Sequence, residues 1–186
     1  MRAIAMFRQP TWLDLQFLGT MPNPIGLPNS VRAAFAAAGW RAGRRVTVPP
    51  VVPHQHPAHA VLAEFGGLMV GRTGHGEECP KHELLFGYVE PDSVILRWAD
   101  LLQSRLIGVA EIEDGHAELY VDASGRWFFA SCIHDAFAFE GASFAEAVER
   151  ELLGRRCKPM LRPDQSSVVM WGEVFTSDDP RVYTYR

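Results

Sequence analysis

Gly39-Trp40-Arg41-Ala42-Gly43-Arg44 and Phe65-Gly66-Gly67-Leu68 are the two segments that decide how this chain begins to fold. Each follows a stretch whose apolar residues recur at helical spacing, so each is expected to end a helix. Gly39 is predicted to be left-handed, a conformation that glycine adopts without strain, and Trp40 beside it to bury a large apolar surface. The pair Gly66-Gly67 is expected to turn the chain from helix to strand where a side chain would clash.

Four helices are predicted along the chain, each with a recognisable start. Asn29 or Ser30 can cap the first, and Gly39 ends it. Pro57 and Pro91 begin the second and third, because proline is favoured in the first helical turn. The segment Ser143-Phe144-Ala145-Glu146 is a capping box that begins the fourth. The predicted helices span residues 30–38, 57–65, 91–102 and 143–153.

Strands are predicted where short apolar runs lie between turn residues. Asp122-Ala123-Ser124-Gly125 joins two of them as a hairpin, since Gly125 supplies positive φ and Asp122 caps its own backbone. The polar, glycine-rich residues 72–79 are expected to form a loop. Residues 68–70 are expected to form a buried strand. The other predicted strands are residues 84–89, 107–112, 117–121, 127–131, 168–171 and 182–185. Their connections are too short for crossover helices, so we predict an α+β fold with a mostly antiparallel central sheet flanked by helices.

The composition is that of an ordinary soluble globule, with 186 residues, 47% hydrophobic and 22% charged. The net charge of −4 argues against nucleic-acid binding, which usually needs a basic face. No apolar run reaches the roughly 18 residues of a membrane span, and Arg8 comes too early for a signal peptide. Three widely spaced cysteines argue against a disulfide framework. We therefore expect a cytoplasmic protein that binds neither nucleic acid nor membranes.

Four motifs in order resemble the third family of the SUKH superfamily. In that family a helix leads into Gly-Trp-x-x-Gly-Arg, and a second helix ends in Phe-Gly-Gly-Leu, as in the two segments quoted first. A hairpin with Leu-Tyr-Val-Asp-x-x-Gly-Arg follows, matched here by residues 119–126, and then a helix that ends in leucines and a glycine, matched by residues 151–154. The resemblance covers residues 31–163. Residues 1–30 are predicted to be a proline-rich N-terminal extension, and residues 164–186 a C-terminal extension that packs on the domain.

The resemblance implies a function in toxin neutralisation. SUKH proteins are largely bacterial immunity proteins encoded beside polymorphic toxins, many of which are nucleases or deaminases. A member is expected to bind its cognate toxin domain and occlude the active site, with no cofactor, no reaction and no catalytic residues of its own. The motif residues are then structural: Gly39, Trp40, Gly43, Arg44, Phe65, Gly66, Gly67, Leu68 and Gly125.

Histidine and cysteine residues offer a competing interpretation. His75, Cys79 and His82 are residue types that zinc accepts as ligands, although structural zinc sites usually have tighter paired spacing. The commoner case is a polar loop that contains histidine, so these three are only weak candidates and no metal is predicted. A second cluster, residues 54–59, contains three histidines but is interrupted by Pro57.

Cys132-Ile133-His134-Asp135 places a nucleophile, a base and an orienting acid side by side. Members of a catalytic triad normally converge from separate segments, and no glycine-rich oxyanion turn precedes the cysteine. The simpler interpretation is a strand end. A metal- or thiol-dependent enzyme remains the alternative function, for which loss of an activity on mutating His82 or Cys132 would be diagnostic. A regulatory protein-binding adaptor with the same fold is a third possibility.

Acidic residues are the first candidates for partner contacts. Glu111, Glu113 and Asp114 lie at the end of one predicted strand, and Glu118 begins the next. Strand alternation predicts that Glu111 and Glu113 share a side. A negative patch can steer a basic partner, whereas the alternative is an ordinary solvated surface.

Three consecutive aromatic residues supply the second candidate surface. Trp127, Phe128 and Phe129 cannot all face inward from one strand, so either Phe128 or the pair Trp127 and Phe129 should point outward. Exposed aromatic side chains are common interface anchors, and we include Trp127 and Phe129 among the candidate contacts. The competing explanation is that the C-terminal residues cover that side, with Trp171, Tyr183 and Tyr185 packing there.

Overall fold

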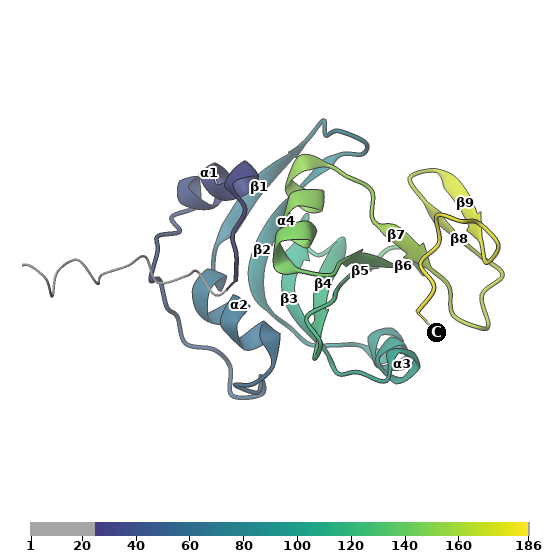
Figure 1. The fold of residues 1–186 in the computed structure, drawn as a ribbon, viewed down its shortest axis with the longest axis horizontal. Helices are drawn as coiled ribbons and strands as arrows, with labels where there is room; N and C mark the ends of the chain where they lie inside the picture. Colours follow the sequence, from purple (N-terminus) through teal and green to yellow (C-terminus); the bar gives the residue numbers. More distant parts are fainter. Residues whose placement is uncertain (1–24, 186) are drawn as a thin grey trace, which may run out of the picture.

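The computed structural model describes residues 25–185; the other residues of the predicted N-terminal extension, 1–24, lie outside this range, as does residue 186. The described residues form an α+β fold with four helices and nine strands (Figure 1). In chain order the elements are α1 (Asn29–Ala37), α2 (Pro57–Phe65), β1 (Met69–Gly74), β2 (Lys81–Val89), α3 (Ser93–Leu102), β3 (Leu106–Ile112), β4 (Ala117–Asp122), β5 (Trp127–Ser131), β6 (Phe137–Gly141), α4 (Phe144–Leu153), β7 (Lys158–Met160), β8 (Ser167–Met170) and β9 (Glu173–Thr176).

The central sheet has seven strands whose spatial order, β1 to β7, is their order in the chain. Every neighbouring pair is antiparallel, as the short connections predict. Residues 122–125 form the predicted β4–β5 hairpin turn, with Gly125 at φ +89°. Asp122 lies at 0% exposure there and accepts hydrogen bonds from the backbone N–H groups of Ser124 and Arg126.

No element is predicted from the sequence at the positions of β6 and β7. β6 follows a loop without a recognisable hairpin turn, and β7 has three residues of which one is proline. A strand that short has no periodicity of its own, so its position is set by pairing with β6.

Helices α1, α2 and α4 pack on one face of the sheet and enclose the larger core. Phe65 of α2 stacks on Phe144 of α4, with 4.9 Å between ring centroids. Phe35 of α1 and Phe86 of β2 join this aromatic group, and all four side chains are buried. Burying each such side chain contributes about 1.5–3 kcal/mol, so the group holds three helices against the sheet.

Helix α3 and the C-terminal residues cover the other face, mainly over β4–β7. Trp98 of α3 stacks on Phe137 of β6 at 4.5 Å, and Phe139 of the same strand stacks on Tyr183 at 4.1 Å. Figure 1 shows α4 and α3 on either side of these strands. This half of the sheet is therefore buried on both faces.

Two predicted helix starts are wrong by one or two residues. Helix α1 begins at Asn29 after Pro28, and neither Asn29 nor Ser30 caps it; the Ser30 hydroxyl donates to Glu149 of α4 instead. Helix α3 begins at Ser93 and not at Pro91, because the Asp92 carboxylate caps it by accepting from the N–H groups of Val94 and Ile95. The starts at Pro57 and at the Ser143 capping box are confirmed.

Two strand predictions also need correction. β1 continues to Gly74, into the predicted loop, and Met69 within it is 50% exposed, although residues 68–70 were expected to form a buried strand. Residues 182–185 are not a strand; β9 at residues 173–176 pairs with β8 in their place. The turn between β8 and β9 contains Trp171 and Gly172, which reverse the chain too early for 182–185 to pair there.

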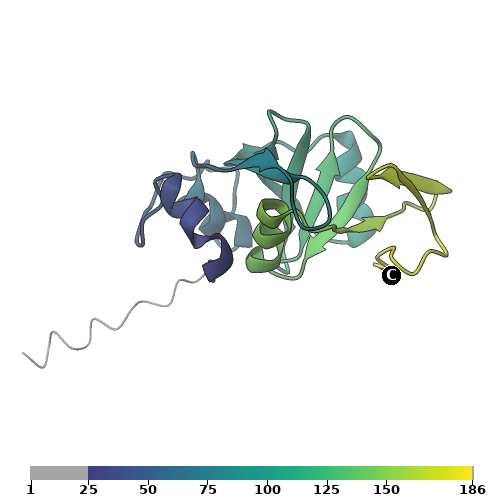
Figure 2. The same cartoon turned by 90° about the horizontal axis from the view of Figure 1, so that it is seen from above.

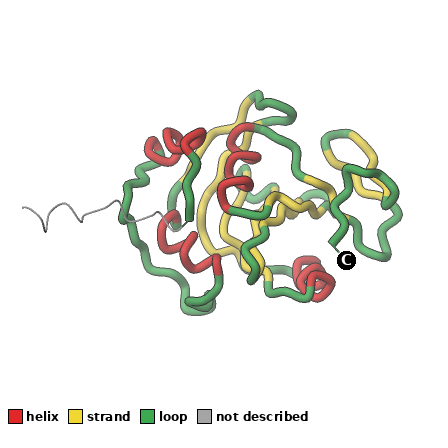
Figure 3. The backbone as a smooth tube through the Cα atoms, in the orientation of Figure 1, coloured by secondary structure: helices red, strands yellow, loops and turns green. Residues whose placement is uncertain are grey.

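The two-stranded sheet β8–β9 lies at the opposite end of the molecule from α1 (Figure 2). At the α1 end, residues 38–56 form the long loop that joins α1 to α2 (Figure 3). None of the helices within residues 25–185 has the length and hydropathy that crossing a membrane requires.

Candidate functional site

The two glycine-rich segments quoted first meet in one corner, although they are separated by α2. The Arg44 guanidinium donates to the carbonyl oxygens of Glu64 and Gly66, each at 2.7 Å. These carbonyls lie at the end of α2, where helix acceptors have no intrahelical partner. The Trp40 indole N–H donates to the buried Glu64 carboxylate at 3.0 Å. Arg44 therefore acts as a side-chain cap brought in from another segment, and this corner is structural.

The glycines of this corner are required for two different reasons. Gly39, Gly43 and Gly67 have φ of +92°, +81° and +80°, as predicted for Gly39. A Cβ at Gly66 would lie 2.6 Å from the Leu62 carbonyl oxygen, which confirms the expected clash there. At Gly67 the expected clash is wrong, because the nearest atom to a Cβ would be 3.9 Å away and only the backbone angle demands glycine.

Of the weak metal candidates, Cys79 and His82 line one small cavity under Trp171, whereas His75 does not. His82 Nδ1 lies 2.5 Å from Glu151 Oε2 of α4. Burial alone would lower the pKa of His82, but the hydrogen bond and charge of Glu151 outweigh it and raise that pKa. Within residues 25–185 no three His, Cys, Asp or Glu side chains are arranged to hold a metal ion.

Cys132, His134 and Asp135 do not form a catalytic arrangement. Both carboxylate oxygens of Asp135 accept from the guanidinium of Arg162, at 2.7 and 2.6 Å. Burial and the charge of Glu118 raise the pKa of Cys132 to about 11, so the thiol stays protonated at neutral pH. A protonated thiol is a poor nucleophile, which argues against the thiol-enzyme alternative at this position.

The aromatic strand β5 does not present the predicted contact surface. Trp127 is 2% exposed and packs edge-on against Phe144, so the prediction that Trp127 contacts a partner is wrong. Phe128 is fully buried under the C-terminal residues, including Tyr183, as the competing explanation expected. Phe129 is half-buried between the main core and the β8–β9 sheet. Because helices or the C-terminal residues cover both faces here, strand alternation alone could not identify an outward side.

Among residues 25–185, no helix or loop covers the other half of the second face. Met69, Leu85, Glu111 and Glu118 are successive cross-strand neighbours on β1, β2, β3 and β4, and we call them the open row. Neighbours across strands point to the same face. Met69 and Leu85 are 50% and 40% exposed, although they are large apolar side chains within strands. The next cross-strand neighbour after Glu118 is Ala130 of β5, which is buried with residues of α3 and does not belong to the open row.

The four predicted acidic contacts separate into two groups. Glu111 and Glu118 lie directly opposite each other in the open row. The prediction that Glu111 and Glu113 share a side of the strand is wrong, because β3 ends at Ile112. In the turn that follows, Glu113 and Asp114 have left-handed φ angles of +48° and +55°. The Glu113 carboxylate accepts from Thr73 of β1 at 3.0 Å, while Asp114 is exposed at the tip.

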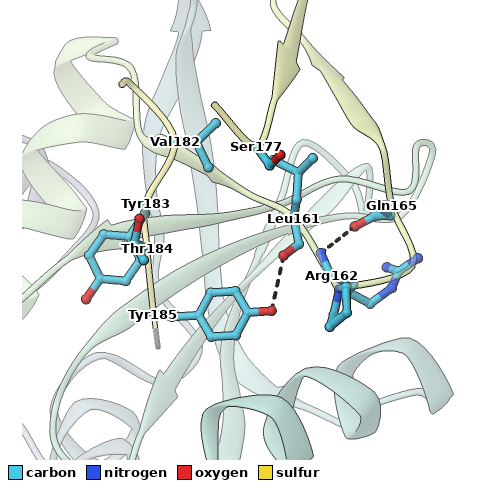
Figure 4. Close-up of a pocket in the computed structure, with 9 residues that line it drawn as sticks. Leu161, Arg162, Gln165, Ser177, Val182, Tyr183, Thr184 and Tyr185 are labelled. Carbon is cyan, nitrogen blue, oxygen red and sulfur yellow. Dashed lines mark hydrogen bonds between the residues drawn. The ribbon is translucent and has the colours of Figure 1, made fainter. Parts of the chain in front are cut away.

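A groove that the sequence did not predict adjoins the open row. It encloses about 480 Å³ between the start of α3 and the loop 131–136, with Glu118, Cys132 and Asp92 in its lining. A second hollow of about 350 Å³ lies where the C-terminal residues return to β7 (Figure 4). There the Tyr185 hydroxyl donates to the Leu161 carbonyl at 3.1 Å, which ties the C-terminal residues to the end of β7.

Comparison with known families identifies the family of this chain. A family model described as SUKH-3 immunity protein matches residues 27–154, more than half of the chain. The chain belongs to the SUKH-3 immunity protein family. No curated protein and no solved structure matched the chain.

The matched residues of this SUKH-3 protein begin just before α1 and end with Gly154, the glycine that ends α4. They include the Trp40–Arg44 corner, the open row and the β4–β5 hairpin. Strand β7 and the β8–β9 sheet lie beyond the match, and so does the return of the chain to residue 185. The predicted boundaries at residues 30 and 163 stay predictions.

This SUKH-3 protein also buries an acidic pair that sequence patterns did not reveal. Glu140 of β6 and Glu151 of α4 are 1% and 4% exposed and line the same small cavity. Burial, followed by the charge of Glu151, raises the pKa of Glu140 well above its usual range. Glu140 Oε2 has no hydrogen-bond partner among the described residues. The pair lies between α4 and β6, away from the open row.

Proposed function

We propose that this SUKH-3 protein is a cytoplasmic bacterial immunity protein that binds one cognate toxin domain through the open row and covers its active site. The observation that carries the proposal is that exposed Met69 and Leu85 share with Glu111 and Glu118 a part of the sheet that no element of residues 25–185 covers. Apolar side chains bordered by polar groups are typical of protein interfaces. Family membership supports the role of an immunity protein.

Charge favours a basic partner surface. None of the lysine, arginine or histidine side chains within residues 25–185 forms an ion pair with Glu111 or Glu118. Complementary charge raises the association rate and selects the partner. A toxin that acts on nucleic acid has a positively charged substrate site, so an acidic sheet face is suited to occluding a nuclease or deaminase.

The test mixes the purified protein with the toxin domain encoded beside its gene and measures complex formation and residual toxin activity. The variant Glu111→Lys should weaken binding at least about tenfold, which corresponds to about 1.4 kcal/mol. It places opposite charges across from each other at Glu111 and Glu118, so it should not destabilise the fold. Asp100→Lys on the exposed side of α3 is the matched control and should bind like the wild type.

Two outcomes contradict the proposal. Absence of both complex and protection would refute immunity by binding. Full inhibition by Glu111→Lys and by a second variant, Leu85→Asp, would show that the toxin binds elsewhere on the molecule.

A further inference from the structure

We propose that the groove beside the open row receives one arginine or lysine side chain of the toxin domain, with its cationic end at Glu118 and its methylene groups between Val94 and Ile133. This inference rests on the proposed function and specifies the chemistry of the partner. It adds residues from α3 and from the 131–136 loop, outside the open row.

The groove is large enough to receive one long side chain. Its volume of about 480 Å³ lies in the range of roughly 300–1,000 Å³ found for small-ligand pockets. Ile95, Ala130 and Phe137, all buried apolar residues, are among the residues that line it. Val94 and Ile133 are 39% and 61% exposed, which is unusual for aliphatic residues on either side of a cleft. Arginine and lysine side chains commonly lay their methylene stems on such surfaces.

The charge of the groove is negative and unbalanced. Glu118 and Asp92 have no ion-pair partner within residues 25–185, while the two arginines of the lining, Arg97 and Arg162, are bound to Asp164 and Asp135. The Glu118 carboxylate accepts from the Tyr120 hydroxyl at 2.5 Å, which fixes its position. The remaining uncompensated charge is therefore anionic and lies at the end where the groove meets the open row.

Cys132, which lines the groove, lies within the field of these carboxylates. After burial, the charges of Glu118, Asp92 and Glu111 all contribute to raising its pKa to about 11. These carboxylates come from three different elements, β4, the start of α3 and β3. Their potentials add at the position of one exposed side chain in the groove.

The free protein also carries a repulsion that a cation would relieve. Glu111 and Glu118 lie directly opposite each other, and like charges in that relation are destabilising. A guanidinium or ammonium group between them would convert the repulsion into two attractions. Binding is thus favoured at the expense of the stability of the unbound fold.

The first experiment uses Cys132 as a built-in probe and needs no toxin. The modification rates of Cys132 by a cationic and an anionic methanethiosulfonate are compared by peptide mass spectrometry, relative to a small reference thiol. Both reagents react with the same thiolate, so the fraction of Cys132 that is deprotonated affects both rates equally. The ratio of the cationic to the anionic rate therefore reports the local electrostatic potential. We expect the cation to be favoured by about tenfold, the lower range for electrostatic steering. Glu118→Gln should reduce this preference, and the Asp100→Asn control should not.

The second experiment measures binding of the toxin domain. Glu118→Gln should weaken the affinity for the toxin domain at least about tenfold. Raising the salt concentration should reduce the difference in affinity between this variant and the wild type, because salt screens the lost charge interaction. Ile133→Ala should weaken the affinity less than Glu118→Gln does, and the affinity of this variant should depend on salt concentration as that of the wild type does. The unfolding midpoints of both variants are measured first, so that loss of folding is not mistaken for loss of binding.

The outcomes separate the two proposals. A toxin that binds Glu118→Gln and Ile133→Ala as tightly as the wild type overturns the groove inference and leaves immunity by binding intact. An unbiased modification rate at Cys132 also overturns the groove inference. Failure of the wild-type protein to bind the toxin overturns both.

Discussion

Two adjacent glycines, Gly66 and Gly67, allow a sharp test of why the corner at the end of α2 requires glycine. The substitutions are Gly66→Ala, Gly67→Ala and Gly67→Asn. All three change one residue at the same helix end. Only the first adds an atom where the Leu62 carbonyl oxygen already lies, at 2.6 Å. The other two leave the nearest atom 3.9 Å from the new Cβ and strain only the backbone.

The expected losses of stability follow from these distances. At Gly66 the added Cβ must displace the last turn of α2, whose Leu62 carbonyl accepts from the Gly66 N–H itself at 2.9 Å. Shifting backbone costs about 1–3 kcal/mol and a lost hydrogen bond about 1 kcal/mol more, so about 3 kcal/mol is expected. Gly67→Ala should cost about 1 kcal/mol, because left-handed strain of about 1–2 kcal/mol is partly offset by the lower entropy of the unfolded chain. Gly67→Asn should cost less, since asparagine tolerates the left-handed region.

The assay is equilibrium unfolding in guanidinium chloride, followed by tryptophan fluorescence and circular dichroism. Trp40 lies in the corner and reports on it directly. Coincident transitions and an unchanged dependence on denaturant are required before the free energies are compared. The reasoning is refuted if Gly66→Ala costs no more than Gly67→Ala, or if asparagine at position 67 is no better than alanine. Folded Gly67→Ala should bind the toxin normally, because the corner does not belong to the open row.

Three further predictions concern the charged or titratable side chains of Arg44, His82 and Asp122. Arg44→Lys should lower the free energy of unfolding by about 1–2 kcal/mol, because an ammonium group cannot bridge the two carbonyls that the guanidinium holds; a loss near zero in denaturant unfolding would contradict the capping role. The raised pKa of His82 means that its pairing with Glu151 stabilises the fold fully below the unfolded value of 6.5 and is lost as pH rises through the higher folded pKa. The free energy of unfolding should therefore fall as pH rises above about 6.5, and His82→Gln should flatten that slope. Burial alone would raise the pKa of Asp122, but hydrogen bonds from Ser124 and Arg126 lower it, so its contribution is present above 3.8 and is lost as pH falls through the folded pKa. Asp122→Ala should cost about 3 kcal/mol at neutral pH, and a stability profile between about pH 2 and about pH 5 identical to the wild type would refute that assignment.

The sequence predicts correctly those helices and turns that are stabilised by contacts between residues only a few positions apart. The Ser143 hydroxyl accepts from the Glu146 N–H, and Glu146 reaches back to the N–H of Ala142, one residue before the cap. The hairpin at residues 122–125 closes on its own aspartate and glycine. Apolar spacing located α2 and α4, and the order of four short motifs pointed to the SUKH-3 family, to which the chain belongs.

The candidate surfaces were predictable only in part. Glu111 and Glu118 were candidates from sequence, and their direct opposition follows from the β3–β4 register. Trp127 was an incorrect candidate, because α4 covers one face of β5 while α3 and the C-terminal residues cover the other. Met69 was expected to be buried and instead begins the open row. The missing information was which face each helix covers, and no local pattern contains it.

Sequence by itself thus determined where helices end, where the central hairpin turns and which family the chain belongs to, since these depend on backbone preferences and contacts between near neighbours. Only the tertiary structure decided that Arg44 caps a helix some twenty residues away, that Glu140 and Glu151 share a buried cavity and that residues 25–185 leave Met69 and Leu85 of the second sheet face exposed. The physical reason is that burial and pairing depend on side chains brought together from distant segments, and their energies are settled only once the sheet and its helices have packed.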